Sequence, residues 1–353
     1  MMTPRENLLS TLRRQGMEGV PIDLSLCESQ VATFERKFGH RDYPTHFGLS
    51  HRGVGIAMRP VEGVRAWYRE TLPESTAFDI WGVGHSKGSA AAFHMTRMHH
   101  PLRGDRTVDE LRAWPLPEFP EEADRKLTAE VEALHARGLA AMGSMACTIW
   151  EIGWYLRSMD DLMDDMSNDD ERAVVWLDRL TAHATERMRR YAKAGCDLVQ
   201  LGDDIGMQHA PMMAVPFWEK WIKPRMAQII AAGREIKPDL LVFYHSCGYI
   251  VPFLDGLLET GVDILNPVQP ECMAFSDVHA RTRGRCSYWG TVGTQTTLPH
   301  GTPGDVRRVV RENLEEMGRG GGLVVAPTHL VEPEVPWENI EALVEEAKAF
   351  RAA

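Results

Sequence analysis

The sequence predicts an α/β protein built as a single (β/α)8 TIM barrel that spans residues 1–353. Short apolar runs recur along the chain, and their length and composition are typical of parallel strands buried on both faces. Helical stretches separate these runs. We count eight such strand–helix units, and eight units in one chain favour a closed barrel over an open, doubly wound sheet.

The N-terminal segment predicts a capped helix followed by the first strand. Thr3 can cap the helix, Pro4 suits its first turn, Glu6 completes a capping-box pattern and Gly16 can end it. The first strand is predicted at 20–26.

The later elements alternate regularly, with irregular excursions expected at about 27–75 and 85–135. The other predicted strands are 76–84, 138–146, 196–204, 240–246, 262–268, 286–292 and 322–328. The predicted helices are 123–137, 157–167, 170–194, 216–236, 251–260, 303–317 (ended by Gly318) and 336–351. A Rossmann-like sheet is the alternative fold, but no G-x-G-x-x-G motif follows a strand.

Composition excludes several classes of function. The chain has 44% apolar residues and a net charge of −11, and its basic residues are scattered, so a nucleic-acid partner is not expected. Its apolar runs are shorter than the roughly 18–20 residues of a membrane helix, and the N-terminus lacks the apolar core of a signal peptide. We therefore expect a cytoplasmic protein with reduced cysteines and no membrane contact. The sequence leaves a homo-oligomer open.

Polar and metal-binding residue types follow most of the predicted strands. In an α/β barrel the active site lies at the carboxyl ends of the strands, so these residues are expected to meet at one mouth. They are, in chain order, Cys27, Glu28, Glu151, Asp203, Asp204, Gln208, His245, Cys247, Asn266, Gln269 and His329.

The strongest local signal is His245-Ser246-Cys247, because imidazole nitrogen and thiolate sulfur are preferred zinc ligands. His329 is the best candidate for a third ligand, and Glu151 for a displaceable fourth. A histidine at a strand end beside a buried thiol is the competing interpretation. Asp203 and Asp204 are candidate catalytic residues, with ordinary helix N-caps as the alternative.

The stretch from about 196 to 345 resembles the uroporphyrinogen decarboxylase superfamily. The resemblance is carried by DLVQLGDDIGMQ, WIKPRMAQI, LLVFYHSCGYIVPFLDGLLETGVDILNPVQ, YWGTVGTQTTLPHGTPGDV and GGGLVVAPTHLVEPEVPWENI, and it implies a single α/β barrel. Decarboxylases of this superfamily carry arginines at the end of the first strand to bind substrate carboxylates. Residues 23–28 hold none, and the acidic mouth disfavours a polyanionic porphyrinogen.

The methyltransferase branch resembles the chain better. Its members move methyl groups between a small molecule and a corrinoid, and those acting on thiols bind zinc through an H-x-C pair and a second cysteine near strand eight. His245 and Cys247 match the pair, whereas His329 stands where the second cysteine is expected. The resemblance thus implies Zn²⁺ and a cobalamin carried by a partner corrinoid protein. Two interpretations stay open: His329 completes the zinc site, or metal binding is weakened or lost.

These observations lead to a mechanistic hypothesis. Zinc acts as a Lewis acid on the heteroatom that carries the methyl group, and an oxygen or nitrogen donor is favoured over a thiol. Glu151 or Asp204 would supply a proton, and Asn266 and Gln269 would orient the substrate. Cys27, Glu28 and Gln208 are further substrate-binding candidates. A metal-free lyase and a non-catalytic ligand-binding barrel are the alternatives.

Overall fold

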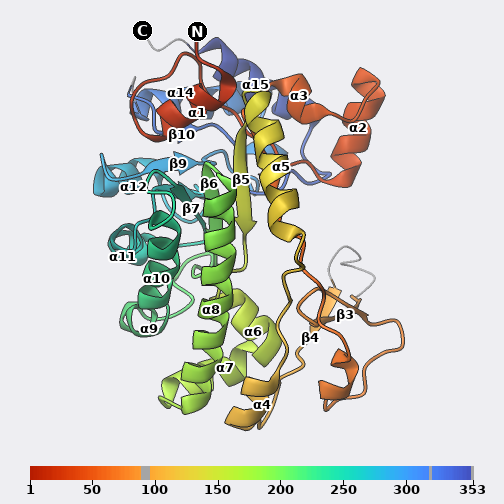
Figure 1. The fold of residues 1–353 in the computed structure, drawn as a ribbon. Helices are drawn as coiled ribbons and strands as arrows, with labels where there is room; N and C mark the ends of the chain where they lie inside the picture. The colour runs from red at the N-terminus through yellow and green to blue at the C-terminus, as the bar shows by residue number, and fades with distance from the viewer. Residues whose placement is uncertain (89–95, 318–319, 351–353) are drawn as a thin grey trace.

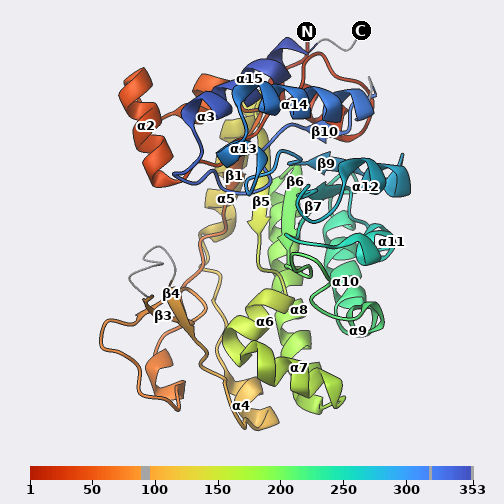
Figure 2. The same cartoon turned by 180° about the vertical axis from the view of Figure 1, so that it is seen from behind.

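Seven parallel strands form the central sheet of the computed structural model, which describes residues 1–88, 96–317 and 320–350. The sheet curls round the centre of the molecule in the order β1-β5-β6-β7-β8-β9-β10 (Figures 1 and 2). Its strands are β1 (His51–Val54), β5 (Ala140–Met145), β6 (Leu198–Gly202), β7 (Leu241–His245), β8 (Ile264–Asn266), β9 (Ser287–Trp289) and β10 (Leu323–Val324). The six predicted strands from 138–146 onward are therefore confirmed, each somewhat shorter than expected.

The predicted first strand, 20–26, adds an eighth extended segment beside β10. Single parallel bridges join Ile22 to Val325 and Leu26 to Val331. On the far side of this segment, Asp23 Oδ1 lies 3.9 Å from His51 Nε2 on β1. A side-chain contact thus links the segment to β1, and the chain has the predicted TIM-barrel-like α/β fold.

The predicted second strand, 76–84, was wrong. Its residues lie in a separate antiparallel sheet, β2-β3-β4, formed by β2 (Ala77–Phe78), β3 (Gly84–Lys87) and β4 (Thr96–His99). The second barrel strand is instead β1, inside the stretch expected to be an excursion. Its four residues, His-Arg-Gly-Val, contain one apolar side chain, so no apolar run marks it.

Helices cover the outer face of the sheet, with α8 lying beside α10 (Figure 1). The helices are α1 (Pro4–Leu12), α2 (Glu28–Phe38), α3 (Tyr43–Phe47), α4 (Val108–Ala113), α5 (Ala123–Ala136), α6 (Trp150–Arg157), α7 (Met159–Ser167), α8 (Glu171–Ala194), α9 (Val215–Trp221), α10 (Lys223–Arg234), α11 (Leu254–Glu259), α12 (Phe275–Thr282), α13 (Thr297–His300), α14 (Pro303–Met317) and α15 (Trp337–Ala349). Short 3-10 helices occur at η1 (Val64–Trp67) and η3 (Val251–Phe253). Within the described residues, none of these helices combines the length and apolarity needed to cross a bilayer.

The helix boundaries confirm most of the predicted ends. The capping box between Thr3 and Glu6 is present at α1. The predicted helix 157–167 corresponds to α7 and follows a further helix, α6, whereas 216–236 is divided into α9 and α10. Gly318 and the predicted end at residue 351 lie outside the described residues.

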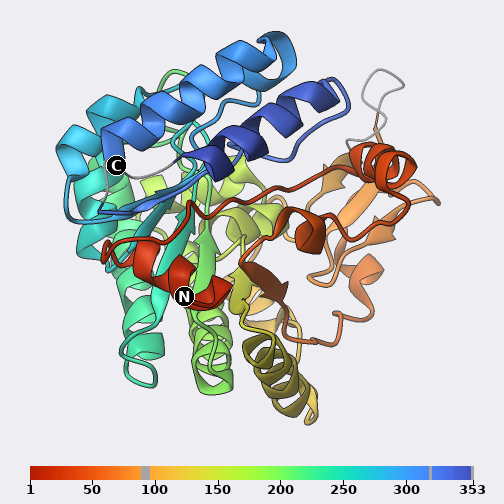
Figure 3. The same ribbon diagram turned by 90° about the horizontal axis from the view of Figure 1, so that it is seen from above.

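Helix α1 closes the amino-terminal end of the barrel (Figure 3). Its buried Leu8, Leu9 and Leu12 pack in one cluster with inward-facing strand residues. The strand members of that cluster are Ala140, Leu198, Leu241, Phe243, Ile264, Trp289 and Val324, and Ala326 joins them just after β10. Because this layer fills the lower barrel, a ligand can enter from the carboxyl ends of the strands.

We expect Gly202→Ala to destabilise the protein by about 2–3 kcal/mol, because a Cβ there would overlap the backbone oxygen of Ala146, which cannot withdraw as a flexible side chain would. Gly53→Ala in β1 is the matched control, since a Cβ there meets no atom within 4 Å. Urea unfolding of both variants measures the difference. Equal stability of the two variants would contradict this close approach of β6 to the loop after β5.

Candidate active site

The alternation of side chains along β7 brings the predicted metal ligands to the barrel mouth. Leu241 and Phe243 face the inner cluster, and His245, two residues further on, faces a cavity above them. On β8, Ile264 likewise packs in the inner cluster, and Asn266, two residues further on, faces the cavity.

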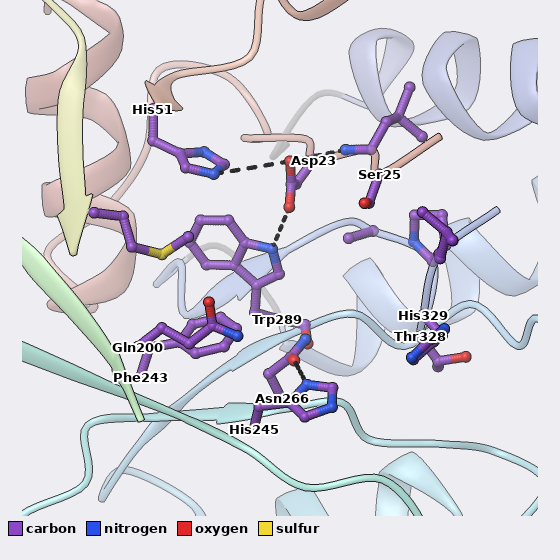
Figure 4. A pocket seen from close by; sticks show the side chains of 15 residues that line it. Asp23, Ser25, His51, Gln200, Phe243, His245, Asn266, Trp289, Thr328 and His329 are labelled. Atoms are coloured by element: carbon purple, nitrogen blue, oxygen red, sulfur yellow. Dashed lines mark hydrogen bonds and ion pairs between the residues drawn. The ribbon is translucent and has the colours of Figure 1, made fainter. Parts of the chain in front are cut away.

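Two hollows open at this mouth. The inner cavity has a volume of about 450 Å³ (Figure 4). It is lined by Asp23, Leu24, Ser25, His51, Met142, Gln200, Phe243, His245, Asn266, Trp289, Ala326, Pro327, Thr328, His329 and Leu330. The outer hollow, of about 380 Å³, is lined by Gly206, Met207, Gln208, Cys247, Gly248, Gln269, Thr294, Gln295, Thr328, His329, Leu330, Glu332 and Glu334. The loop at 328–330 is common to both, so His329 stands between them.

Three side chains that could bind a metal ion, those of Asp204, His245 and Cys247, lie together at this mouth, and we call them the metal group. His245 Nε2 lies 3.6 Å from Cys247 Sγ and 3.7 Å from Asp204 Oδ1, and the three ligand atoms lie within 4.8 Å of one another. Asp204 also accepts a hydrogen bond of 2.8 Å from the Cys247 backbone N–H, which joins the two loops. One nitrogen, one sulfur and one oxygen donor form a chemically suitable set for Zn²⁺.

Asn266 determines which nitrogen of His245 is available to a metal. Its Nδ2 donates to the Trp289 carbonyl oxygen at 2.6 Å, so its Oδ1 is the atom that faces His245 Nδ1, also at 2.6 Å. Nδ1 must therefore donate its proton to that oxygen. Neutral His245 is then left with a lone pair on Nε2, the atom nearest Cys247 and Asp204.

His329 lies close to this group without joining it. The centres of the His245 and His329 rings are 6.3 Å apart. Burial lowers the pKa of His329, and the neighbouring His245 lowers it further. His329 therefore faces the metal group across the mouth as a neutral imidazole at neutral pH.

The Cys247 thiol is held in its protonated form in the absence of a cation. Burial raises its pKa to about 12, and the charges of Asp204 and Glu151 contribute to the increase. A bound metal ion is the kind of group that reverses such a shift, because it stabilises the thiolate directly.

Asp203 and Glu151, the other two predicted catalytic carboxylates, hold the backbone at the barrel mouth in place. Asp203 is buried and accepts hydrogen bonds from four backbone N–H groups, those of Thr148, Ile149, Trp150 and Glu151, at 2.9–3.1 Å. It therefore caps α6, the alternative that its position after a strand left open. Burial raises the pKa of Asp203 to about 7, with a contribution from Glu151, while the amide donors oppose the increase.

Glu151 stands behind Asp204 rather than in the metal group. Its Oε1 accepts from the Tyr155 hydroxyl at 2.9 Å and its Oε2 from the Asp204 backbone N–H at 3.2 Å. Burial raises the pKa of Glu151, and the charge of Asp204 raises it further. Glu151 thus positions the loop that carries Asp204.

Three of the five predicted substrate-binding residues line one of the two hollows, and the other two lie away from both. Asn266 lines the inner cavity, while Gln208 and Gln269 line the outer hollow. Cys27 precedes α2 and lies beside Ser29, and Glu28 forms an ion pair with Arg41 on the exposed surface; neither lines a hollow.

The residues of the inner cavity that the sequence did not reveal include Asp23, Ser25, His51, Gln200 and Trp289. A signal was present for the first two. In the predicted strand 20–26 the apolar Ile22, Leu24 and Leu26 alternate with Asp23 and Ser25, so these two polar side chains belong on the opposite face. His51 carried no such signal, because β1 was not recognised.

Comparison with known proteins identifies the family of this barrel. The family model for uroporphyrinogen decarboxylase (URO-D) matches residues 96–350. The chain belongs to the URO-D family. A uroporphyrinogen decarboxylase of Legionella pneumophila (strain Lens) is 25% identical over 348 residues, covering 96% of this chain and 94% of the relative. One from Thermus thermophilus is 26% identical over 259 residues, covering 70% of each chain.

Among solved structures, a methyltransferase from Methanosarcina mazei has a similar fold. It matches with a TM-score of 0.68 and 17% sequence identity, covering 98% of both chains. This likeness supports the TIM-barrel-like fold described above.

We expect Asp203→Asn to lower the free energy of unfolding by about 2 kcal/mol, because an amide nitrogen would face two of the four N–H donors. Asp170→Asn is the matched control. Asp170 caps the more exposed start of α8 through one backbone N–H and pairs with the partly exposed Arg172 side chain, so asparagine keeps the cap and loses only that ion pair, which is worth up to about 1 kcal/mol. Thermal unfolding followed by circular dichroism compares the two, and a similar loss in both variants would argue against a special role of the Asp203 cap.

Proposed function

We propose that this URO-D family member is a methyltransferase that uses Zn²⁺ to act on a small methylated compound. The observation that carries the proposal is the group of His245, Cys247 and Asp204, with Nε2 of His245 left free for a metal by Asn266. The solved structure with the same fold is itself named a methyltransferase, which supports the same assignment.

The charge of the mouth supports this activity over decarboxylation of a porphyrinogen. The described residues that line the two hollows include Asp23, Glu332 and Glu334, and they include no lysine or arginine. A substrate with several carboxylates would meet repulsion rather than the cationic surface it requires.

Each residue of the site has a defined task in this proposal. His245 Nε2, Cys247 Sγ and Asp204 Oδ1 hold the metal, and Asn266 holds the Nδ1 proton of His245. When bound, Zn²⁺ supplies a Lewis acid that makes the demethylated heteroatom a better leaving group.

The inner cavity binds the methyl donor, and His329 contacts its reacting end from the opposite side of the mouth. We assign to His329 a fourth bond to the metal, which a neutral imidazole nitrogen can make. Because the metal group contains one thiolate together with harder nitrogen and oxygen donors, an O- or N-methyl compound fits it better than a thioether. A corrinoid carried by a partner protein would accept the methyl group over the outer hollow.

Purified protein is expected to bind one zinc ion per chain, measured by inductively coupled plasma mass spectrometry after dialysis. We expect Cys247→Ser and His245→Ala to weaken zinc binding by about 100-fold or more, since each removes a direct ligand. Cys27→Ser is the matched control, because that thiol lies outside the metal group and serine suits the helix start it occupies. Zinc retention by Cys247→Ser would refute the assigned site.

The activity is tested with a methoxy compound and reduced cobalamin, with methylcobalamin formation followed by absorbance. Transfer should require zinc and cease after chelation. Turnover of uroporphyrinogen that survives chelation, without methyl transfer, would instead establish a metal-free decarboxylase.

Asn266→Ala tests the orientation of His245 separately from direct ligation. We expect zinc affinity to fall by about 10–100-fold, because the Nδ1 proton loses its acceptor and the ring its fixed orientation. A competitive chelator titration measures this loss. An affinity equal to that of the unaltered protein would show that the ring is held by its other contacts alone.

A further inference from the structure

The wall of the inner cavity opposite the metal group carries one carboxylate, that of Asp23 (Figure 4). Its Oδ2 accepts a hydrogen bond of 3.0 Å from the Trp289 indole N–H, and its Oδ1 accepts one of 2.8 Å from the Leu24 backbone N–H. The side chain keeps 23% of its surface exposed. Asp23 is thus held in a fixed orientation while it remains open to the cavity.

No cationic side chain among the described residues of the cavity wall balances the charge of Asp23. Arg52 on β1 interacts with Asp23 electrostatically, but it donates its hydrogen bonds to Leu49, His51 and Thr45. The other ionisable side chains of that wall are His51, His245 and His329. His51 is the nearest to Asp23, with Nε2 3.9 Å from Oδ1, and burial lowers the pKa of its imidazole. The hydrogen-bond donors that Asp23 does have, an indole and an amide, are neutral.

The surface between Asp23 and the metal group is largely apolar. Met142, Phe243 and Trp289 line the cavity together with the one polar amide of Gln200, and the centroids of the two aromatic rings lie 5.4 Å apart in an edge-to-face arrangement. Such a surface suits a short hydrocarbon linker. It gives little solvation to a charged group placed between the two ends, so a charge on the ligand is best placed at Asp23.

We propose that Asp23 binds a cationic group of the substrate, such as an ammonium or guanidinium, while the reacting heteroatom of the same molecule lies at His245, Cys247 and Asp204. Asp23 is then the residue that determines specificity, and the substrate is a small molecule with a cationic end and a methylated heteroatom. This inference rests on the proposed function, because it takes the metal group as the reacting end.

The test measures binding, by isothermal titration calorimetry, of paired thiol probes to the zinc-loaded protein. Each pair consists of an ω-aminothiol and the ω-hydroxythiol of the same length, in a series of increasing length, because sulfur binds zinc strongly and makes the affinity measurable. We expect the amino probe to bind about tenfold more tightly than its hydroxyl partner at the best-fitting length. In Asp23→Asn this preference should fall below about threefold while affinity for the hydroxyl probes is unchanged.

The unchanged hydroxyl affinity and the zinc content of Asp23→Asn show that the variant is folded and its metal group intact. Glu334→Gln is the matched control for charge, since it removes a carboxylate from the outer hollow alone and should keep the preference. Equal binding of amino and hydroxyl probes at every length, or a preference that survives Asp23→Asn, would overturn the inference and leave the metal site standing. Failure of every thiol to bind the zinc-loaded protein would instead count against the proposed function and the inference together.

Discussion

The hydrogen bond from His245 Nδ1 to Asn266 Oδ1 determines what the mouth of this barrel is able to bind. Both residues come from neighbouring parallel strands, where His245 pairs in register with Asn266, so the backbone ladder itself sets their spacing. The Asn266 amide is fixed in turn by the Trp289 carbonyl on the next strand. Three adjacent strands therefore orient one imidazole, and the free Nε2 that results is a property of the barrel rather than of a mobile loop.

The other two members of the metal group depend on contacts behind them. Asp204 and Cys247 both follow the ends of strands, where the regular ladder no longer fixes the chain. Asp203 compensates by binding the start of α6, and Glu151 on that helix accepts the backbone N–H of Asp204. The buried Asp203 and the partly buried Glu151 thus hold the loop that carries Asp204. Burial raises the pKa values of both carboxyl groups and a neighbouring negative charge raises each further, so this arrangement costs free energy.

Much of the fold follows from sequence patterns that have a direct physical cause. The apolar runs that became β5 to β10 are buried on both faces, and the strand-end rule correctly placed His245 and Cys247 at one mouth. The rule that strand ends converge does not say which side chain turns inward, however. The rule therefore could not predict that Asp204 points to His245 and Cys247 while the adjacent Asp203 points to the start of α6. Strand β1 could not be predicted because its burial comes from tertiary packing. His51 lies on this strand, so its place in the cavity could not be predicted either.

Asp23 shows why a binding surface is harder to predict than a metal ligand. The residue types of a histidine and a cysteine two positions apart already suggest metal binding. The role of an aspartate depends on the groups that surround it in the folded structure. In this barrel it faces neutral donors, apolar walls and a cavity shared with the metal group. The metal ion that we propose at one end of the cavity would be a positive charge, and it would attract an electron-rich ligand group. The Asp23 carboxylate at the other end would attract a cationic group. The two ends of the cavity would thereby distinguish the two ends of a ligand by charge.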